Sequence, residues 1–298
     1  ALLTIVLEDY FQAPTFRGDI RPRDWDWYPS RIETAVDRWL DLLERHHARA
    51  TWFVLGWQAA RHPDLVRRIA AQGHEIACGP HQALDTRRLT PAQFREDVKN
   101  AKDAVENACG QEVRGFRGPN LFPGRSLTTL LETLAEFGFR YDSSSDADTA
   151  ARHPALRVPH RVETGSGSLW ELPALSFSFM GRRVGAANGA LRHMPLSAVL
   201  AGVSRCVDRH RQPAVLGVRS WELDDRQPRL HCGIGDRFTH YRGLSLMGRR
   251  VERLLRQFRF STCEDVVSTL VAARHRASLA ASATHEVTPD VLAEIEKL

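Results

Sequence analysis

The sequence predicts an α/β protein in which helices wrap a parallel sheet, either as a barrel or as an open sheet. Strand-like apolar segments alternate with helix-like segments through most of the 298 residues, and parallel strands need such crossover connections. The opening run 4–7 is apolar and β-branched, as expected for a buried strand, and it ends in Glu8 and Asp9. In parallel α/β folds the chemistry lies where strands end. These carboxylates are therefore candidates for a metal or acid/base site, the alternative being a solvated turn.

Helix signals are clearest in the first 110 residues. Ser30 and Glu33 have the spacing of a capping box ahead of apolar residues at helical spacing. Thr90 and Gln93 repeat this signal for a longer helix, which Gly110 ends. The other elements expected in this part of the chain are strands at 50–55 and 74–78 and a helix at 64–72.

The second half predicts shorter elements around a looser middle, 147–167, which is polar and punctuated by glycine and serine. A buried strand at 214–221 runs into Glu222. Residues 1–275 are expected to form the body, and the Ala- and Ser-rich stretch 276–298 a C-terminal tail or loose helix. The other expected elements are strands at 113–117, 139–144, 169–175 and 260–263 and helices at 126–137, 195–209, 244–258, 265–273 and from Pro289 onward.

Composition narrows the function classes. The net charge is +5, but no block of five or six like charges supports a nucleic-acid footprint. No apolar run approaches the ~20 residues of a membrane span, and no signal peptide is visible. The five cysteines are widely spaced without a CxxC pair, which predicts reduced thiols in a cytoplasmic protein. Nucleotide binding is disfavoured because GxGxxG and Walker-type loops are absent from the sequence.

Six short segments occur in an order that is characteristic of one family. They are E-D-Y-F at 8–11, Y-P-S-R at 28–31, R-A-T-W-F-V-L-G-W at 49–57, G-H-E-I-A at 73–77, R-Y-D-S-S at 140–144 and S-W-E-L-D at 220–224. With these segments the chain resembles the NodB-type polysaccharide deacetylases over about residues 2–270, most of all the branch associated with exosortase and exopolysaccharide gene clusters. The resemblance implies a distorted (β/α) barrel with its active site at the carboxyl ends of the strands. It also implies hydrolysis of N-acetyl groups on amino sugars with one divalent metal.

The positions that the resemblance assigns to the chemistry do not carry the residues that the reaction needs. Such a reaction uses a carboxylate and two histidines as metal ligands, a second carboxylate as base and a histidine as acid. Here the base position falls on Val6, the ligand histidines on Gly79 and Ala83, and the acid on Arg219. None of these side chains can ligate zinc or exchange a proton as required. The resemblance therefore predicts a pseudoenzyme that no longer performs metal-dependent deacetylation and needs no cofactor.

A remnant of the catalytic site is expected in the cleft. Glu8 or Asp9 stands at the metal carboxylate and Arg117 at the arginine position beside the base, and Arg219 replaces the acid. The two arginines either form a structural ion pair with the acid or hold an anion such as a carboxylate, phosphate or uronic acid. The candidate substrate-binding residues, which could stack on or hydrogen-bond a sugar, are Trp25, Trp170, Trp221, Arg117, Arg219 and Asp142.

Three functions remain open. The first is binding of an amino-sugar polysaccharide or anionic glycan in the old cleft. The second is an active hydrolase of C–N non-peptide bonds with a rebuilt zinc site at Glu8, Asp9, His81 and Asp85, although a lone loop histidine is more often solvated. The third is a structural partner of exopolysaccharide-assembly proteins. Cys78 could be a nucleophile, but without a partner at fixed spacing it is expected to be a small buried hydrophobe.

Overall fold

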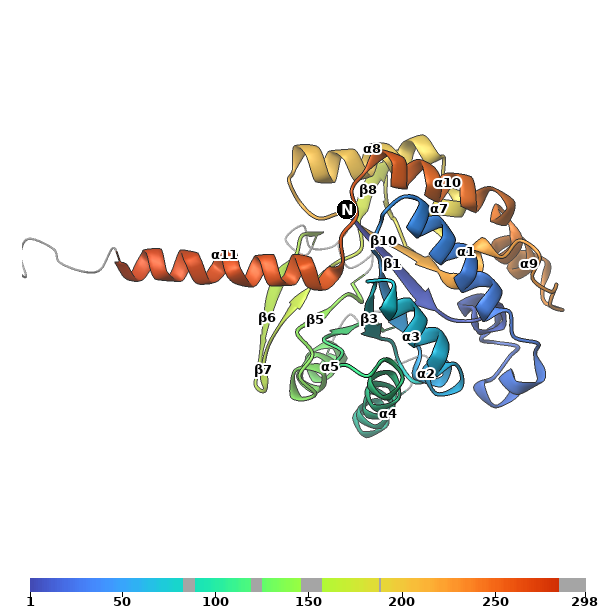
Figure 1. Ribbon diagram of the computed structural model, residues 1–298, viewed down its shortest axis with the longest axis horizontal. Helices are drawn as coiled ribbons and strands as arrows, with labels where there is room; N and C mark the ends of the chain where they lie inside the picture. Colours follow the sequence, from blue (N-terminus) through green and yellow to red (C-terminus); the bar gives the residue numbers. More distant parts are fainter. Residues whose placement is uncertain (83–88, 119–124, 146–156, 188, 284–298) are drawn as a thin grey trace, which may run out of the picture.

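A curled eight-stranded sheet forms the centre of the molecule (Figure 1). The computed structural model describes residues 1–82, 89–118, 125–145, 157–187 and 189–283. The strand order is β10-β1-β2-β3-β4-β5-β7-β6, and every pair is parallel except the antiparallel pair β6 and β7. The strands are β1 (Leu2–Leu7), β2 (Thr51–Val54), β3 (Glu75–Cys78), β4 (Gly115–Phe116), β5 (Tyr141–Asp142), β6 (His160–Thr164), β7 (Gly167–Glu171) and β10 (Val215–Arg219).

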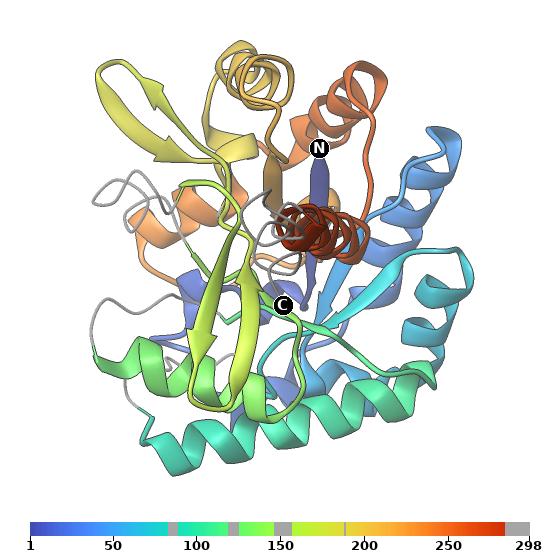
Figure 2. The same cartoon turned by 90° about the vertical axis from the view of Figure 1, so that its left-hand side faces the viewer.

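Helices surround this sheet, as the end-on view shows (Figure 2). The predicted α/β fold with helices around a parallel sheet is thereby confirmed, as a half-barrel with edges at β10 and β6 within the described ranges. A separate hairpin, β8 (Ser176–Phe179) and β9 (Arg182–Gly185), extends from the body. The α-helices are α1 (Ile32–Arg45), α2 (Gly56–Arg61), α3 (Pro63–Ala71), α4 (Pro91–Cys109), α5 (Arg125–Glu136), α7 (Ala190–His193), α8 (Leu196–Ser204), α9 (Ile234–Tyr241), α10 (Leu244–Gln257) and α11 (Cys263–Ala283).

The first strand divides the core into two sides because successive side chains of a strand point to opposite faces. Leu3 and Ile5 belong to the large cluster between the sheet and its helices. Leu2 belongs instead to an inner cluster with Phe53 and Tyr141. In the parallel pairing of β1 with β10, Val6 lies opposite Arg219, so the two strands end side by side.

The capping signals in the sequence had different outcomes. At α4 the capping box is present, since the Gln93 N–H donates to Thr90 Oγ1 and the Gln93 side chain accepts from the Thr90 N–H. Gly110 ends this helix in the left-handed region, with φ +71°. At α1 the prediction of a Ser30 cap is wrong. The N-cap is Arg31; the Ser30 oxygen still accepts from the Ile32 N–H at 3.3 Å, while its hydroxyl donates to Asp9.

Other differences arise near the chain end and in the middle. The strand predicted at 260–263 is wrong, since Ser261 makes only an isolated bridge to Leu2. Helix α11 is longer than the predicted 265–273 and runs across residue 275. The hairpin β8–β9 was missed, although Ser-Phe-Ser-Phe alternates like a strand and Met180-Gly181 turns with both φ values positive. The elements β6, α2 and α9 were also missed.

Some predictions cannot be compared with the structure. The final helix from Pro289 lies outside the described residues, as does most of the polar stretch before residue 157. In the part of the chain that is described, no helix combines the length and the apolar character needed to cross a membrane.

Candidate binding site at the carboxyl ends of the strands

The ends of β1 and β10 bring Glu8 and Arg219 together. Because Val6 and Arg219 are register partners, the chain after β1 passes beside the end of β10. The Arg219 Nη1 lies 2.6 Å from Glu8 Oε1, and the two side chains are only 12% and 1% exposed. The structure therefore contains the ion pair that was one of the two expectations for these residues.

Two neighbours of Arg219 complete the surroundings of Glu8. The Trp221 indole N–H donates to Glu8 Oε1 at 3.0 Å. The Ser220 hydroxyl donates to the Glu8 carbonyl at 2.5 Å, and its oxygen accepts from the Glu8 N–H at 3.0 Å. These residues lie in the 3₁₀ turn η7 (Ser220–Leu223), which directly follows β10. The tight turn after the strand end brings two donors, the Arg219 guanidinium and the Trp221 indole N–H, to the Glu8 carboxylate, and brings the Ser220 hydroxyl to the Glu8 backbone.

Packing fixes Trp221 in this position. Its side chain is buried, and its ring stacks on His240 with the centroids 4.1 Å apart. The Arg192 guanidinium lies 4.9 Å from the Trp221 centroid and donates to Glu222 Oε1 at 2.7 Å. Trp221 was predicted to stack on a sugar; in this structure its ring is covered by protein and its N–H holds Glu8.

Asp9 has a different set of partners from those of Glu8. Its carboxylate accepts hydrogen bonds from the Ser30 hydroxyl at 2.5 Å, the Arg31 N–H at 3.0 Å and the Tyr10 N–H at 2.9 Å. Burial raises the pKa of Asp9, and these hydrogen bonds act in the opposite direction. Asp9 thus anchors the start of α1 and caps the turn that follows β1.

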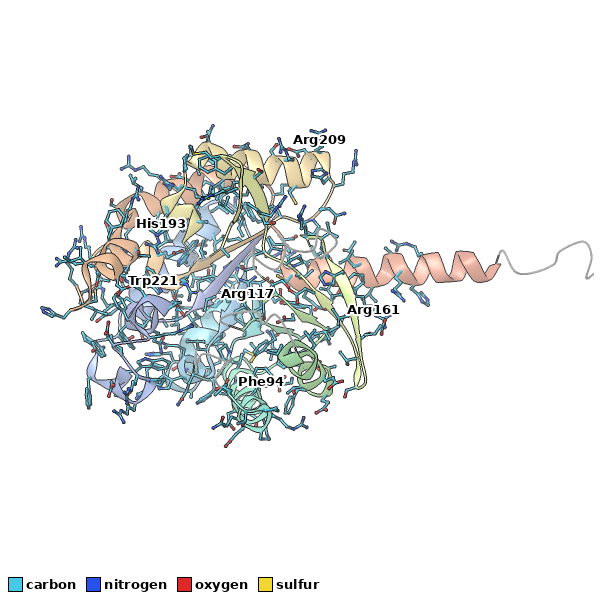
Figure 3. All side chains as sticks on the ribbon, turned by 180° about the vertical axis from the view of Figure 1, so that it is seen from behind. Phe94, Arg117, Arg161, His193, Arg209 and Trp221 are labelled. Carbon is cyan, nitrogen blue, oxygen red and sulfur yellow. The ribbon has the colours of Figure 1, made fainter. Side chains whose placement is uncertain are left out.

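The expected position of Arg117 is wrong, because its guanidinium does not face Glu8 and Asp9. Its guanidinium donates to Thr4 Oγ1 at 2.5 Å and to both oxygens of Ser143 at 2.7 Å, and it lies over the Phe53 ring at 4.3 Å. Figure 3 shows Arg117 near the middle of the sheet and Trp221 farther toward α9. Burial lowers the pKa of Arg117. The guanidinium of Arg117 thus forms its hydrogen bonds inside the half-barrel.

The described residues do not assemble a site for a catalytic zinc ion. Glu8 and Asp9 are held by other partners, and Asp85 and Ala83 lie outside the described residues. His81 has a buried Nδ1 without a hydrogen-bond partner, but only its backbone N–H contacts a carboxylate, that of Asp97 at 2.9 Å. Across the described ranges, no group of three or more His, Cys, Asp and Glu side chains could hold a metal ion.

Cys78 does not offer a nucleophile in this arrangement. Its thiol is completely buried, donates to the Gly79 carbonyl at 3.0 Å, and has its pKa raised well above the usual value by desolvation. A thiol in such surroundings stays protonated at neutral pH and is inert.

Asp142 has a partner that sequence reasoning missed. It is the register partner of Glu171, and the two buried carboxyl groups are hydrogen-bonded to each other. Asp142 also accepts from the Ser144 hydroxyl at 2.6 Å, and Glu171 from the Ser145 N–H at 3.0 Å. Burial raises the pKa of both carboxyls, and the neighbouring Asp142 adds to the effect on Glu171. A glutamate inside the apolar run L-W-E-L was the available signal.

The remaining tryptophan candidates are not brought to one place. Trp25 is buried and packs its edge against Trp57, with the ring centroids 5.2 Å apart. Trp170 is the register partner of Tyr141 and lines a pocket with Gly138 and α11. That pocket lies near the amino end of β5, away from Glu8.

Comparison with known proteins separates the chain into two matched segments. Residues 24–141 match the model of the polysaccharide deacetylase family, and residues 143–268 match a domain of unknown function, DUF3473. A chitooligosaccharide deacetylase of Bradyrhizobium sp. is 40% identical over 81 residues, which are 27% of this chain and 37% of that protein. A peptidoglycan-N-acetylglucosamine deacetylase of Bacillus cereus is 28% identical over 100 residues, or 34% and 35% of the two chains. These matches span little more than a third of the length of the relatives.

Two solved structures share the fold over nearly the whole chain. A crystal structure described as a putative polysaccharide deacetylase from Mycobacterium smegmatis is 19% identical, with a TM-score of 0.62 and coverage of 92% and 90%. One from Pseudomonas aeruginosa PAO1, described as a probable polysaccharide deacetylase, is 15% identical, with a TM-score of 0.58 and coverage of 90% and 89%. At these identities the similarity establishes the fold alone.

Proposed function

We propose that this chain, which carries a polysaccharide deacetylase domain followed by a DUF3473 domain, binds an amino-sugar polysaccharide or an anionic glycan without hydrolysing it. The observation that carries the proposal is the buried ion pair between Arg219 and Glu8. It uses the carboxylate that a catalytic metal would need.

Electrostatics explains why this pair and a divalent metal exclude each other. A cation bound to Glu8 would lie within a few ångströms of the Arg219 guanidinium, which is 2.6 Å from the same oxygen. Two unit charges of like sign repel by about 4 kcal/mol at 4 Å and an effective dielectric of 20, and a divalent ion doubles that. No histidine of the described residues compensates, because Gly79 stands at one family ligand position and Ala83 at the other.

The ligand class follows from the family. The named relatives are deacetylases of chitooligosaccharide and of peptidoglycan N-acetylglucosamine, so an acetylated amino sugar is the first ligand to test. An anionic glycan is the second, because the carboxyl ends of the strands carry a guanidinium where the resemblance places a neutral or titrating imidazole.

A metal and product assay tests the loss of hydrolysis. After dialysis against excess zinc and removal of free metal, we expect less than stoichiometric zinc by elemental analysis and no acetate release from chitopentaose. The matched control is the fourfold variant Val6→Asp, Gly79→His, Ala83→His and Arg219→His, in which we expect zinc binding to appear. One tightly bound zinc per wild-type chain together with acetate release would overturn the proposal in favour of a rebuilt hydrolase site.

A separate titration tests the binding. We expect chitopentaose or an oligouronate to give a saturable calorimetric signal with the wild-type chain and a weaker one with Arg219→Lys, because lysine keeps the charge but not the forked geometry. Absence of any signal with both sugars would contradict binding and favour a structural role.

A further inference from the structure

We propose that a pocket at the opposite end of the sheet, between α5, the β6–β7 hairpin and α11, binds an anionic sugar unit. Its volume is about 580 Å³, within the range of small-molecule sites. This inference does not depend on the ligand proposed for the carboxyl ends of the strands. Its lining includes Arg140, Arg161, Trp170, Val271 and Arg274.

One wall of the pocket is helix α11, whose first residues are hydrogen-bonded to the sheet. The Cys263 N–H donates to Thr51 Oγ1 at 2.9 Å, and the Glu264 N–H donates to Glu75 Oε2 at 3.0 Å. Thr51 is buried and Glu75 is partly buried, so these bonds anchor the start of α11, which then extends away from the body (Figure 1). Val267 and Val271, one turn apart, both line the pocket; Val267 is buried, and Val271 is 42% exposed.

The opposite wall is formed by the sheet. Trp170 on β7 is partly buried and packs beside the inner cluster that contains Tyr141 and Leu172. Arg161 on β6 is its register partner, and Figure 3 shows Arg161 beside the base of α11. An aromatic surface and a guanidinium therefore share one wall of the pocket.

The charge of the lining is one-sided. Among the described residues, the lining contains three arginines and His275, and no aspartate or glutamate. Two of the arginines have acidic neighbours, since Arg140 pairs with Glu264 and Arg161 with Glu163 at 2.8 Å. Glu163 is 66% exposed, so it screens Arg161 weakly. Within the described ranges, Arg274 makes no ion pair, and the pocket retains a positive excess.

The pocket combines apolar side chains with arginines, and this combination indicates the chemical class of its ligand. An inorganic anion would use the arginines but leave Trp170 and Val271 uncovered, and a neutral sugar would leave the guanidinium of Arg274 uncompensated. A sugar ring that carries a carboxylate or a phosphate satisfies both, because its apolar face packs on an aromatic ring while arginine holds the anion through paired hydrogen bonds. The shared chemistry is a pyranose with one anionic group.

The test is a calorimetric titration of the full chain with trigalacturonate, glucose 1-phosphate, chitotriose and inorganic phosphate at low and moderate salt. We expect trigalacturonate or glucose 1-phosphate to bind, more weakly as salt rises, and to bind more tightly than phosphate or chitotriose. The first two ligands distinguish a uronic acid from a sugar phosphate. We expect Arg274→Gln to weaken binding by about tenfold or more, since a charge-assisted hydrogen bond is lost.

Matched variants locate the site. Arg253→Gln, on the exposed part of α10, changes the net charge equally and should leave the affinity unchanged. Trp170→Phe keeps an aromatic ring and should weaken binding less than Trp170→Leu. Binding of neither anionic sugar, equal effects of Arg274→Gln and Arg253→Gln, or loss of binding in Arg219→Lys with Arg274→Gln unaffected would each overturn the proposal.

Discussion

The ion pair between Glu8 and Arg219 is largely buried. Forming the whole pair and removing one of its partners therefore have different effects on the stability of the fold. The pair as a whole need not stabilise the fold, because both charges were desolvated to form it. Removing one partner is different, since it leaves the other charge buried. The Glu8 carboxylate would retain only the Trp221 indole and the Ser220 contact on its backbone.

We therefore expect Arg219→Ala to lower the free energy of unfolding by about 3–5 kcal/mol. The double variant Arg219→Ala with Glu8→Gln should recover part of this loss, because no bare charge remains. Urea denaturation monitored by tryptophan fluorescence measures both. Arg68→Ala is the matched control, since its ion pair with Asp37 is exposed and should contribute less than about 1 kcal/mol. A loss as small as that of the control would contradict a buried, uncompensated Glu8.

For single residues, the sequence predicts which side chains lie in the same region but not which groups they hydrogen-bond. The family resemblance placed Glu8 and Arg219 in one cleft, and in the structure they form an ion pair. Arg117 also follows a predicted strand, yet its guanidinium turns to Thr4 and Ser143. The choice depends on which polar groups of the barrel interior lie within reach, and one sequence does not show that.

At the scale of elements, the ends of β5 and β7 hold the pair Asp142 and Glu171. Burial and mutual proximity raise the pKa of both carboxyls. A group whose pKa is higher in the folded than in the unfolded state contributes stability below the unfolded pKa and loses it as the pH rises through the folded pKa. The proton shared by this pair should therefore stabilise the fold under acidic conditions and less so at alkaline pH.

We expect Glu171→Gln to be more stable than the wild type at pH 8 and equally stable near pH 4. The amide keeps the acceptor for the Ser145 N–H and donates permanently to Asp142. The difference should grow by up to about 1.4 kcal/mol per pH unit over the interval between the two pKa values. Melting temperatures from pH 4 to 8 measure it, with Glu163→Gln on the exposed side of β6 as control. A constant offset at all pH values would show that no proton is shared.

Elements with strong local signals could be predicted from the sequence. The apolar run of β1 and the cap, first-turn proline and final glycine of α4 gave the correct type and nearly the correct ends. The cap of α1 was placed one residue early, since the N-cap is Arg31, although the Ser30 oxygen does accept from the Ile32 N–H at 3.3 Å. The strand predicted at 113–117 is present but shorter, as β4, and it packs so closely on its neighbour that a Cβ at Gly115 would lie 2.0 Å from Tyr141 Cζ.

At the scale of the whole molecule, each end of the half-barrel contains a buried histidine kept neutral by desolvation. His240, near the carboxyl ends of the strands, has its pKa lowered to about 3, first by burial and then by Arg192 and Arg219. His74, at the amino end, has its pKa lowered to about 4 by burial and then by Arg49. Both groups take up a proton in the unfolded chain near pH 6.5, well before they do so in the fold.

The change of stability with pH that these histidines cause is opposite in direction to the change caused by the pair of Asp142 and Glu171. A lowered histidine pKa gives stability that is complete above pH 6.5 and is lost as the pH falls toward the folded pKa. For His240 the loss at pH 5 should be roughly 2 kcal/mol relative to pH 7. We expect His240→Gln, which can keep the hydrogen bond to Gln227 but loses the stacking on Trp221, to be less stable at pH 7.

The test of a neutral His240 is how the free energy of unfolding changes with pH, not its value at one pH. Between pH 7 and pH 5 the unfolding free energy of His240→Gln should fall by about 2 kcal/mol less than that of the wild type. Urea denaturation at the two pH values measures this, and His210→Gln at an exposed position is the matched control. Equal slopes for wild type and His240→Gln would mean that His240 is protonated in the fold. That result would contradict the neutral stack of His240 on Trp221, which holds the indole N–H toward Glu8.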